Sequence, residues 1–237
     1  MLILAGTGIN FDLTNSCIEE LKKCSEVFIE TYTNLISQEE IKKMEQLIGK
    51  KIQILTRDQV ESSYLIEKAK NSDICLLASG DPLTATTHII LLIEAKEKSV
   101  KTKVFHNSSI YSAAAGKSGL QIYRFGKTAT LVNPRPNYKP TSSLEIIREN
   151  ISRNIHSLVL LDTEPKPMEA RVALELLNEF EQAIVLSRIG LIDEKISFGK
   201  VNDLITQELG SAPFTIIIPA KLHPIEEEFL RFYLISR

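Results

Sequence analysis

The sequence has no tryptophan and only three cysteines in 237 residues. The odd number of cysteines, without any closely spaced pair, argues against a disulfide framework and predicts a reducing compartment. Cys17 and Cys24 lie on one predicted helix, and we interpret both as buried apolar residues. The four histidines are scattered without the spacing of metal ligands, so no structural metal is expected.

Long apolar runs and an excess of one charge are also missing. The longest uniformly apolar stretches, such as residues 89–93 and 216–218, fall far short of the roughly 20 residues that span a bilayer. The first residues, MLILAGTG, lack the basic region of a signal peptide, so we expect a cytoplasmic protein with no membrane contact. The net charge is −2, with basic residues mixed among acidic ones, which disfavours direct binding of nucleic acid.

Apolar residues make up 43% of the chain, in short runs separated by helical patterns. The length suits one large or two ordinary α/β domains, and two are expected. Strands that alternate with helices predict an α/β fold with mixed, mainly parallel sheets. A new series of elements begins near residues 107–112, so we expect domains at 1–108 and 109–237. The predicted strands are 2–5, 27–29, 52–55, 74–78, 103–106, 130–132, 158–161, 184–187 and 215–218.

Four helix starts are predicted from a Ser or Thr followed three residues later by Glu or Gln. In such a capping box the two side chains satisfy free backbone N–H groups at the start of the helix. A glycine at residue 49 is expected to end a helix, because glycine readily adopts the left-handed conformation of that position. The capping pairs are Ser16 with Glu19, Ser37 with Glu40, Thr56 with Gln59, and Ser142 with Glu145.

Gly6-Thr7-Gly8 follows the first predicted strand and has two interpretations. A dinucleotide site would use such glycines, but it requires a third one where this chain has Phe11. The alternative is a tight turn between a strand and a loop. In both interpretations the backbone comes close to another group, either a ligand or another part of the chain.

The segment Ser79–His88, SGDPLTATTH, places polar residues directly after a fully apolar strand. Asp81 and Pro82 suit the cap and the first position of a helix. Equally, open α/β sheets bind ligands beyond the carboxyl ends of their strands, where Gly80 would let a ligand touch the backbone. A carboxylate there would attract a cationic ligand.

GDPLTATTH closely resembles the GDPLVATTH motif of diphthine synthases, a branch of the tetrapyrrole-methylase-like methyltransferases. Further blocks resemble the same family in order: LAGTG, YTNL, RDQVE, HNSSIYS, GLQIYRFGK and PAKLH. The resemblance covers nearly the whole chain. It implies two α/β domains with a cofactor cleft between them, usually in a homodimer.

The resemblance also implies an activity. The methyl donor would be S-adenosylmethionine, and the protein substrate would be translation elongation factor 2. The amino group of its 3-amino-3-carboxypropyl-histidine would be methylated repeatedly to give diphthine, in diphthamide biosynthesis. The cofactor contacts that the family implies fall on Ile9, Asp81, Thr84, Ser109, Ile110, Leu161, Ile189 and Phe214.

Three positions depart from the family pattern. Phe214 replaces a histidine, Ile189 a small residue and Ala220 a glycine, so the adenine side of the pocket is expected to differ in shape. No catalytic base is identified, and Asp81 is expected to attract the cationic donor. Tyr32 and Tyr111 are candidate aromatic faces for the methylated cation.

Other functions remain open on the sequence alone. Within the same superfamily these are methylation of a corrinoid or sirohaem precursor and ribose methylation of ribosomal RNA. The charge distribution speaks against RNA. A module that binds a cofactor or partner without catalysis is the alternative of a different class, because a fold does not guarantee an activity.

Overall fold

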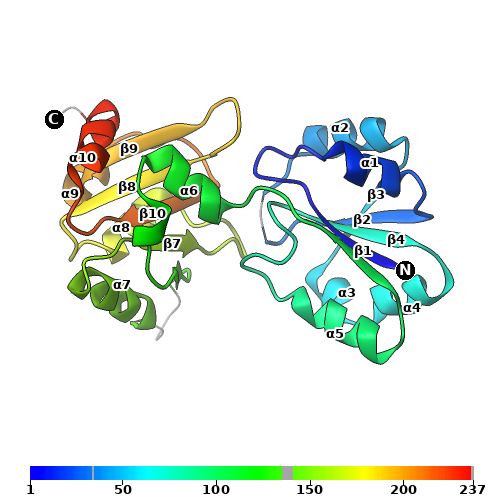
Figure 1. The fold of residues 1–237 in the computed structure, drawn as a ribbon. Coiled ribbons are helices and arrows are strands. Elements are labelled where there is room, and N and C mark those ends of the chain that lie inside the picture. Colours follow the sequence, from blue (N-terminus) through cyan, green and yellow to red (C-terminus); the bar gives the residue numbers. More distant parts are fainter. Residues whose placement is uncertain (34, 135–140, 236–237) are drawn as a thin grey trace. The chain divides into compact units, whose positions relative to one another are not determined.

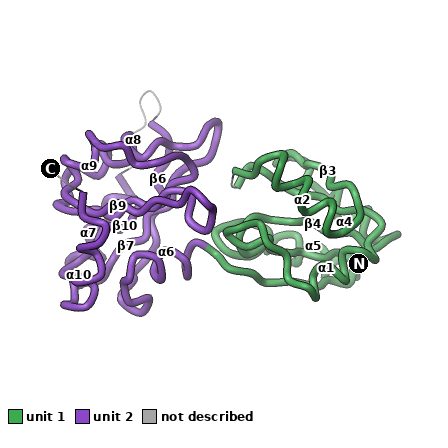
Figure 2. Tube along the Cα trace, turned by 90° about the horizontal axis from the view of Figure 1, so that it is seen from above, with its two compact units in different colours: residues 1–109 green, residues 110–237 purple. Residues whose placement is uncertain are grey.

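The computed structural model describes residues 1–33, 35–134 and 141–235, which divide into two compact units, 1–109 and 110–237 (Figure 2). The division lies one residue beyond the expected domain boundary. Each unit has a five-stranded sheet with helices packed on it, which confirms the α/β class (Figure 1). None of the helices in the described residues is long and apolar enough to span a membrane.

Unit 1 contains a fully parallel sheet in the order β3-β2-β4-β1-β5. Its central strands β1 and β4 are apolar and buried along their whole length, as expected for a parallel sheet covered on both faces. The strands are β1 (Leu2–Gly6), β2 (Glu26–Glu30), β3 (Ile52–Leu55), β4 (Ile74–Ala78) and β5 (Thr102–Phe105).

Two helices cover one face of this sheet and three cover the other (Figure 1). The chain leaves β1 toward the first face and leaves the neighbouring β4 toward the second. Adjacent strands with such opposite connections form the switch point where open α/β sheets bind ligands. The helices are α1 (Asn15–Leu21) and α2 (Gln38–Ile48) on the first face, and α3 (Arg57–Glu61), α4 (Tyr64–Asn71) and α5 (Ile89–Glu97) on the second.

The capping predictions were correct where the pair coincides with the helix start. Both capping boxes at α2 and α3 are present, with Ser37 and Thr56 as caps, and Gly49 ends α2 with a φ of 69°. The box at Ser16 is wrong, because the helix begins earlier and its cap is Thr14. The box at Ser142 is also wrong, because Ser142 already lies within a helix.

Unit 2 contains a mixed sheet in the order β6-β7-β10-β8-β9. Only β6 and β7 are parallel, and the other three neighbouring pairs are antiparallel. The strand β9 was not predicted, since Ile196 and Phe198 are its only apolar residues and do not form a run. The strands are β6 (Ala129–Leu131), β7 (Ser157–Leu161), β8 (Gln182–Ser187), β9 (Lys195–Lys200) and β10 (Phe214–Ile218).

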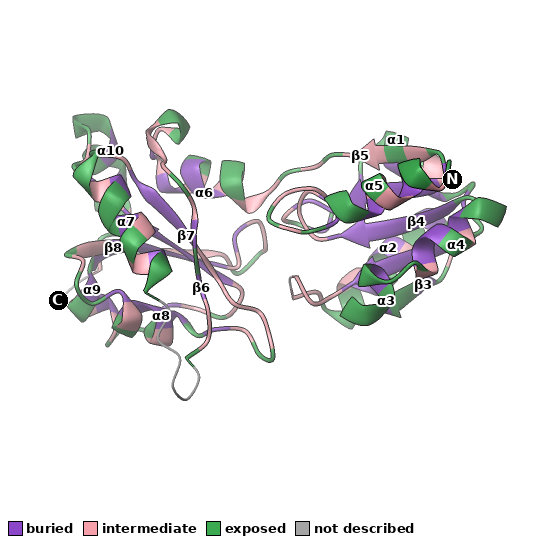
Figure 3. Ribbon diagram, turned by 90° about the horizontal axis from the view of Figure 1, so that it is seen from below, coloured by how far each residue is buried: buried purple, intermediate pink, exposed green. Residues whose placement is uncertain are grey.

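The helices of unit 2 bury one large core against its sheet, through α7, α8 and α9. Figure 3 shows the central strands of both sheets as buried, while β5 at one edge of the unit 1 sheet is partly exposed and the helices turn exposed residues outward. The helices are α6 (Ile110–Ser118), α7 (Ser142–Ser152), α8 (Ala170–Leu176), α9 (Val201–Leu204) and α10 (Pro224–Leu230), with short 3-10 turns η1 (Ile122–Arg124) and η2 (Arg231–Tyr233).

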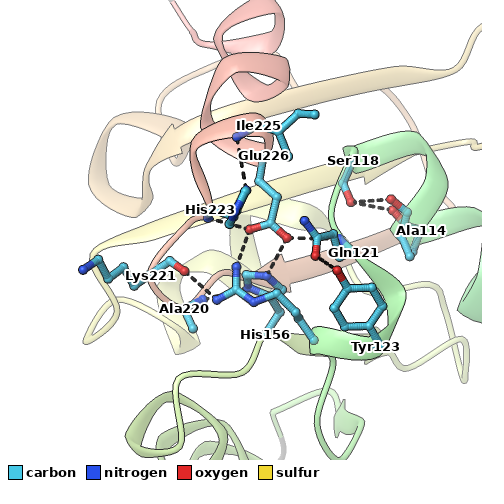
Figure 4. A network of polar contacts seen from close by, with 12 residues as sticks. Ala114, Ser118, Gln121, Tyr123, His156, Ala220, Lys221, His223, Ile225 and Glu226 are labelled. Carbon is cyan, nitrogen blue, oxygen red and sulfur yellow. Dashed lines mark hydrogen bonds and ion pairs between the residues drawn. The ribbon is translucent and has the colours of Figure 1, made fainter.

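A buried polar network joins α10 to η1 and to the residue before β7, and we define it by Arg124, His156 and Glu226. Figure 4 shows the contacts around Glu226 and His156. The Glu226 side chain is fully buried and pairs with Arg124, while its Oε1 also lies 3.4 Å from His156 Nε2. The same carboxylate accepts from the backbone of Gln121 and His223.

Candidate functional site

The loops that follow β1 and β4 are joined through their backbones. Gly8 N–H donates to the Gly80 carbonyl at 3.0 Å, and Gly80 N–H donates back to the Gly8 carbonyl at 3.1 Å. Both glycines have positive φ angles, 68° and 70°, which residues with a Cβ rarely adopt. The pair therefore fixes the two loops against each other beyond the ends of the strands.

At Gly6 the backbone of β1 approaches the loop after β4 still more closely. A Cβ atom at this position would lie 2.3 Å from the Gly80 carbonyl oxygen and 3.0 Å from Asn107 Cβ. The close backbone approach predicted here is thus made between loops of the chain itself. The dinucleotide interpretation is wrong, because α1 begins only at Asn15 and no helix start follows the glycines directly.

Asp81 closes a turn and does not start a helix. Residues 82–88 form turns and bends, and α5 begins at Ile89. Asp81 Oδ1 accepts from the Leu83 backbone N–H at 3.0 Å and from the Thr84 hydroxyl at 3.2 Å. The interpretation of Asp81 as a helix cap is therefore wrong, since its carboxylate makes the local turn that Asp and Asn commonly make with following residues.

The second oxygen of Asp81 connects this turn to the loop after β5. Oδ2 lies 2.8 Å from His106 Nδ1 and accepts from the Asn107 backbone N–H at 3.3 Å. Burial acts to raise the pKa of Asp81, but hydrogen bonds from Leu83, His106 and Asn107 outweigh it, and the pKa is lowered. Asp81 is therefore ionised at neutral pH.

Asn107 and Ser108 hold the loop after β1 in place. Asn107 Nδ2 donates to the carbonyls of Gly6 at 3.0 Å and Asp12 at 2.8 Å. Ser108 Oγ accepts from the Ile9 backbone N–H at 3.2 Å. Since β1 lies between β4 and β5, loops from three adjacent strands converge at one edge of unit 1. We call residues 7–12, 79–84 and 106–109 the loop cluster.

Four of the eight cofactor contacts implied by the resemblance lie in the loop cluster. Ile9 follows β1, Asp81 and Thr84 share the turn after β4, and Ser109 follows β5. The parallel sheet brings them to the same edge, because carboxyl ends of parallel strands face the same way. The structure therefore brings these four residues together within unit 1.

Three of the remaining contacts lie at one end of the unit 2 sheet. Leu161 ends β7 and Phe214 begins the antiparallel β10, in a register that pairs Leu160 with Thr215. The Arg188 backbone N–H donates to the Pro213 carbonyl at 3.0 Å, which holds the loop carrying Ile189 beside the start of β10. The last contact, Ile110, begins α6.

Ala220 has a structural role away from these residues. It follows the opposite end of β10 from Phe214, and its backbone N–H donates to His156 Nδ1 at 3.0 Å. Ala220 thus lies at the other end of the sheet from Leu161, Ile189 and Phe214. A cavity of about 640 Å³ in unit 2 lies at this opposite end, and none of the predicted contact residues lines it.

The two candidate tyrosines have different surroundings. The Arg57 guanidinium lies 4.9 Å from the centre of the Tyr32 ring, so one face of Tyr32 already receives a cation. Tyr111, in the first turn of α6, is 37% exposed. A cation-binding role for either ring stays a prediction.

Known proteins share this fold along the whole chain. A profile of the family described as Tetrapyrrole (Corrin/Porphyrin) Methylases matches residues 1–205. A protein of Methanocaldococcus jannaschii named diphthine synthase is 41% identical, with 98% of each chain covered. One of Methanococcus vannielii with the same name is 37% identical. A crystal structure of diphthine synthase matches with a TM-score of 0.90 at 34% identity, covering 99% of this chain and 96% of that chain.

The chain belongs to the diphthine synthase family. A structure of a putative diphthine synthase from Entamoeba histolytica agrees, with a TM-score of 0.89, 31% identity and 100% of this chain covered. The predicted family resemblance is thereby confirmed. Its members are methyltransferases, and this protein is a methyltransferase.

Three polar residues of the loop cluster were not identified from the sequence. His106, Asn107 and Ser108 connect the loops after β1, β4 and β5, but the sequence placed His106 at the end of a strand. The signal was the block HNSSIYS, which resembles the family and places polar side chains directly after β5.

Proposed function

We propose that the protein uses S-adenosylmethionine to methylate repeatedly the amino group of 3-amino-3-carboxypropyl-histidine in translation elongation factor 2, giving diphthine in diphthamide biosynthesis. The observation that carries this proposal is the 41% identity to a diphthine synthase over 98% of both chains. We further propose that it acts in the cytoplasm, as a homodimer.

The loop cluster fits a cationic donor of this kind. Asp81 supplies a carboxylate that is ionised at neutral pH, which favours a positive charge nearby. Ser79 Oγ is buried at the end of β4 without a hydrogen-bond partner among the described residues, so a polar atom remains available there. The proposed donor-binding residues of unit 1 are Ile9, Asp81, Thr84 and Ser109.

Unit 2 would supply apolar walls. Ile189 and Phe214 are each 7% exposed, and Leu161 is partly buried against the same core as Phe214. Ligand pockets are commonly lined by such side chains, with few polar groups that fix orientation. We propose that Ile110, Leu161, Ile189 and Phe214 contact the donor.

The bound donor would supply an electrophilic methyl group on a sulfonium. The residues of the chain act by placing the acceptor amine in line with that methyl group and by excluding water, which together supply most of the acceleration for such a transfer. The acceptor nitrogen must be neutral to react. The acceptor is an α-ammonium, whose pKa lies at about 8 or above, so a proton must be removed before each transfer at neutral pH.

Methylation of a tetrapyrrole precursor is a second candidate. The family profile that matches residues 1–205 is described by that activity, so the same fold serves both substrates. The two candidates differ in their acceptor, a protein side chain in one and a free macrocycle in the other.

Transfer of a labelled methyl group separates these functions. The protein is incubated with S-adenosylmethionine labelled in the methyl group and, separately, with modified elongation factor, a tetrapyrrole precursor or ribosomal RNA. Label on the elongation factor alone is expected. Label on the tetrapyrrole or the RNA would replace the proposal, and label on none would favour a binding module.

A further inference from the structure

His106 stands directly after β5 and forms one contact with a charged group. Its Nδ1 lies 2.8 Å from Asp81 Oδ2, and its side chain is 69% exposed. Lys103, on the same strand, pairs instead with Glu20 of α1. The described residues form no hydrogen bond to His106 Nε2.

The contact with Asp81 decides which nitrogen of His106 carries the proton. Asp81 is a carboxylate at neutral pH, so it accepts and the Nδ1 of His106 must donate. In a neutral imidazole the other nitrogen then has a free lone pair. The structure thus presents His106 Nε2 as an exposed basic nitrogen, oriented by a carboxylate on the opposite side of the ring.

Three other titratable groups near this edge are buried or already hydrogen-bonded. Asp81 already accepts four hydrogen bonds. Glu30, at the end of β2, is fully buried and accepts from Tyr32 and Thr33. His88 is 3% exposed and bonds the Pro82 carbonyl through Nδ1.

We propose that His106 is the general base that takes a proton from the acceptor ammonium before each methyl transfer, with Asp81 as its positioning residue. This inference rests on the proposed function. Repeated methylation of one nitrogen to the quaternary product needs one proton removal for each methyl group. An exposed imidazole suits this repetition, because it can return each proton to water.

In each cycle an N–H bond of the ammonium breaks and its electron pair stays on nitrogen. The proton moves to His106 Nε2. The nitrogen lone pair then forms the bond to the methyl carbon, while the carbon–sulfur bond breaks and its electrons remain on sulfur as a neutral thioether. The imidazolium finally loses the proton to solvent, which restores the base for the next transfer.

The substitution His106→Asn tests the base directly. The asparagine amide nitrogen can replace Nδ1 as donor to Asp81, but nothing replaces Nε2. We expect S-adenosylmethionine affinity, measured by calorimetry, to stay within about 3-fold, because the loop contact is kept. The single-turnover rate at neutral pH should fall by about 10² to 10⁴, the usual contribution of a general base.

Two further measurements distinguish a base from a structural role. The rate of His106→Asn should rise as the pH approaches the pKa of the acceptor, and added imidazole should restore part of it at neutral pH. His223→Asn is the matched control, since His223 is an exposed histidine that caps α10, where asparagine is also a good cap. This control should keep the wild-type rate.

The proposal is overturned if His106→Asn transfers methyl at the wild-type rate at neutral pH. It is also overturned if the rate falls but neither high pH nor imidazole restores it. The wild-type protein is measured first on the same acceptor. Absence of transfer by the wild type would refute the proposed function itself, whereas normal transfer by both proteins would refute only the role of His106.

Discussion

The carbonyl oxygen of Gly80 lies 2.3 Å from the point where residue 6 would carry a Cβ atom. Gly6 ends β1 and Gly80 follows β4, so these adjacent strands approach at their carboxyl ends more closely than any side chain allows. The positions of the two loops that carry Ile9 and Asp81 depend on this close approach.

Gly6→Ala is therefore expected to separate the two loops. The added methyl must displace backbone, which costs about 1 to 3 kcal/mol of unfolding free energy, as overpacking does. Donor affinity should fall as well, because Ile9 and Asp81 lie in the displaced loops. The measurements are denaturant unfolding and calorimetry.

Gly116→Ala is the control for that experiment. Gly116 lies in α6, and nothing would be within 4 Å of its Cβ. Alanine in a helix should raise stability by about 0.5 to 1 kcal/mol. Equal effects of the two substitutions would contradict the close approach.

Asp81→Asn tests the connection between the turn after β4 and the loop after β5. An amide in place of the carboxylate can accept on one side only, so at least one of the donors from Leu83, Thr84, His106 and Asn107 loses its acceptor. We expect weaker donor binding and a lower single-turnover rate at saturating donor. Unchanged binding in calorimetry would contradict the role of Asp81 at the donor site.

Glu226→Gln should destabilise unit 2. The fully buried carboxylate is the ionic partner of Arg124, whose side chain is 18% exposed, and removing one partner of a buried pair costs about 3 kcal/mol or more. Glu149→Gln is the control, because Glu149 and Arg153 form an exposed pair of the kind that contributes about 1 kcal/mol or less. Denaturant unfolding measures both, and similar losses would refute the importance of the network.

His156 should make stability depend on pH below about 6.5. Burial lowers the pKa of this imidazole, and Arg124 acts in the same direction, while Glu226 opposes them. The unfolded chain therefore binds the proton first, so stability is complete above about pH 6.5 and falls as the pH drops toward the folded pKa.

His156→Asn should flatten that part of the profile, since asparagine does not titrate there and can still accept from the Ala220 N–H. Glu226 does not interfere, because its pKa is lowered from 4.5 and its stabilising contribution is lost only at more acidic pH. The unfolding free energy between pH 5 and 7 is the measurement. Parallel profiles of the variant and the wild type would contradict the buried neutral imidazole.

Much of the fold follows from local patterns in the sequence. The central strands β1 and β4 of unit 1 are buried along their whole length, so each appears as a short apolar run. Ser37, Thr56 and Gly49 mark helix ends through local hydrogen bonds and backbone conformation. β9 was not predicted because it is a strand through its pairing with β8, and a pairing with a distant segment cannot be recognised from the local sequence of β9.

The site was predicted less completely, because it depends on contacts far apart in the chain. Asp81 matched a helix cap equally well, and only its contact with His106, 25 residues away, shows that it joins two loops. Likewise, the glycines near residue 6 signalled a close approach, but the sequence could not name Gly80 as the neighbour.

The most direct test of the proposed function is the intact mass of elongation factor 2 that carries 3-amino-3-carboxypropyl-histidine, before and after incubation with the protein and S-adenosylmethionine. The account predicts a gain equal to several methyl groups, placed by fragmentation on that one residue. An unchanged mass, with the donor bound and the protein folded, would contradict it.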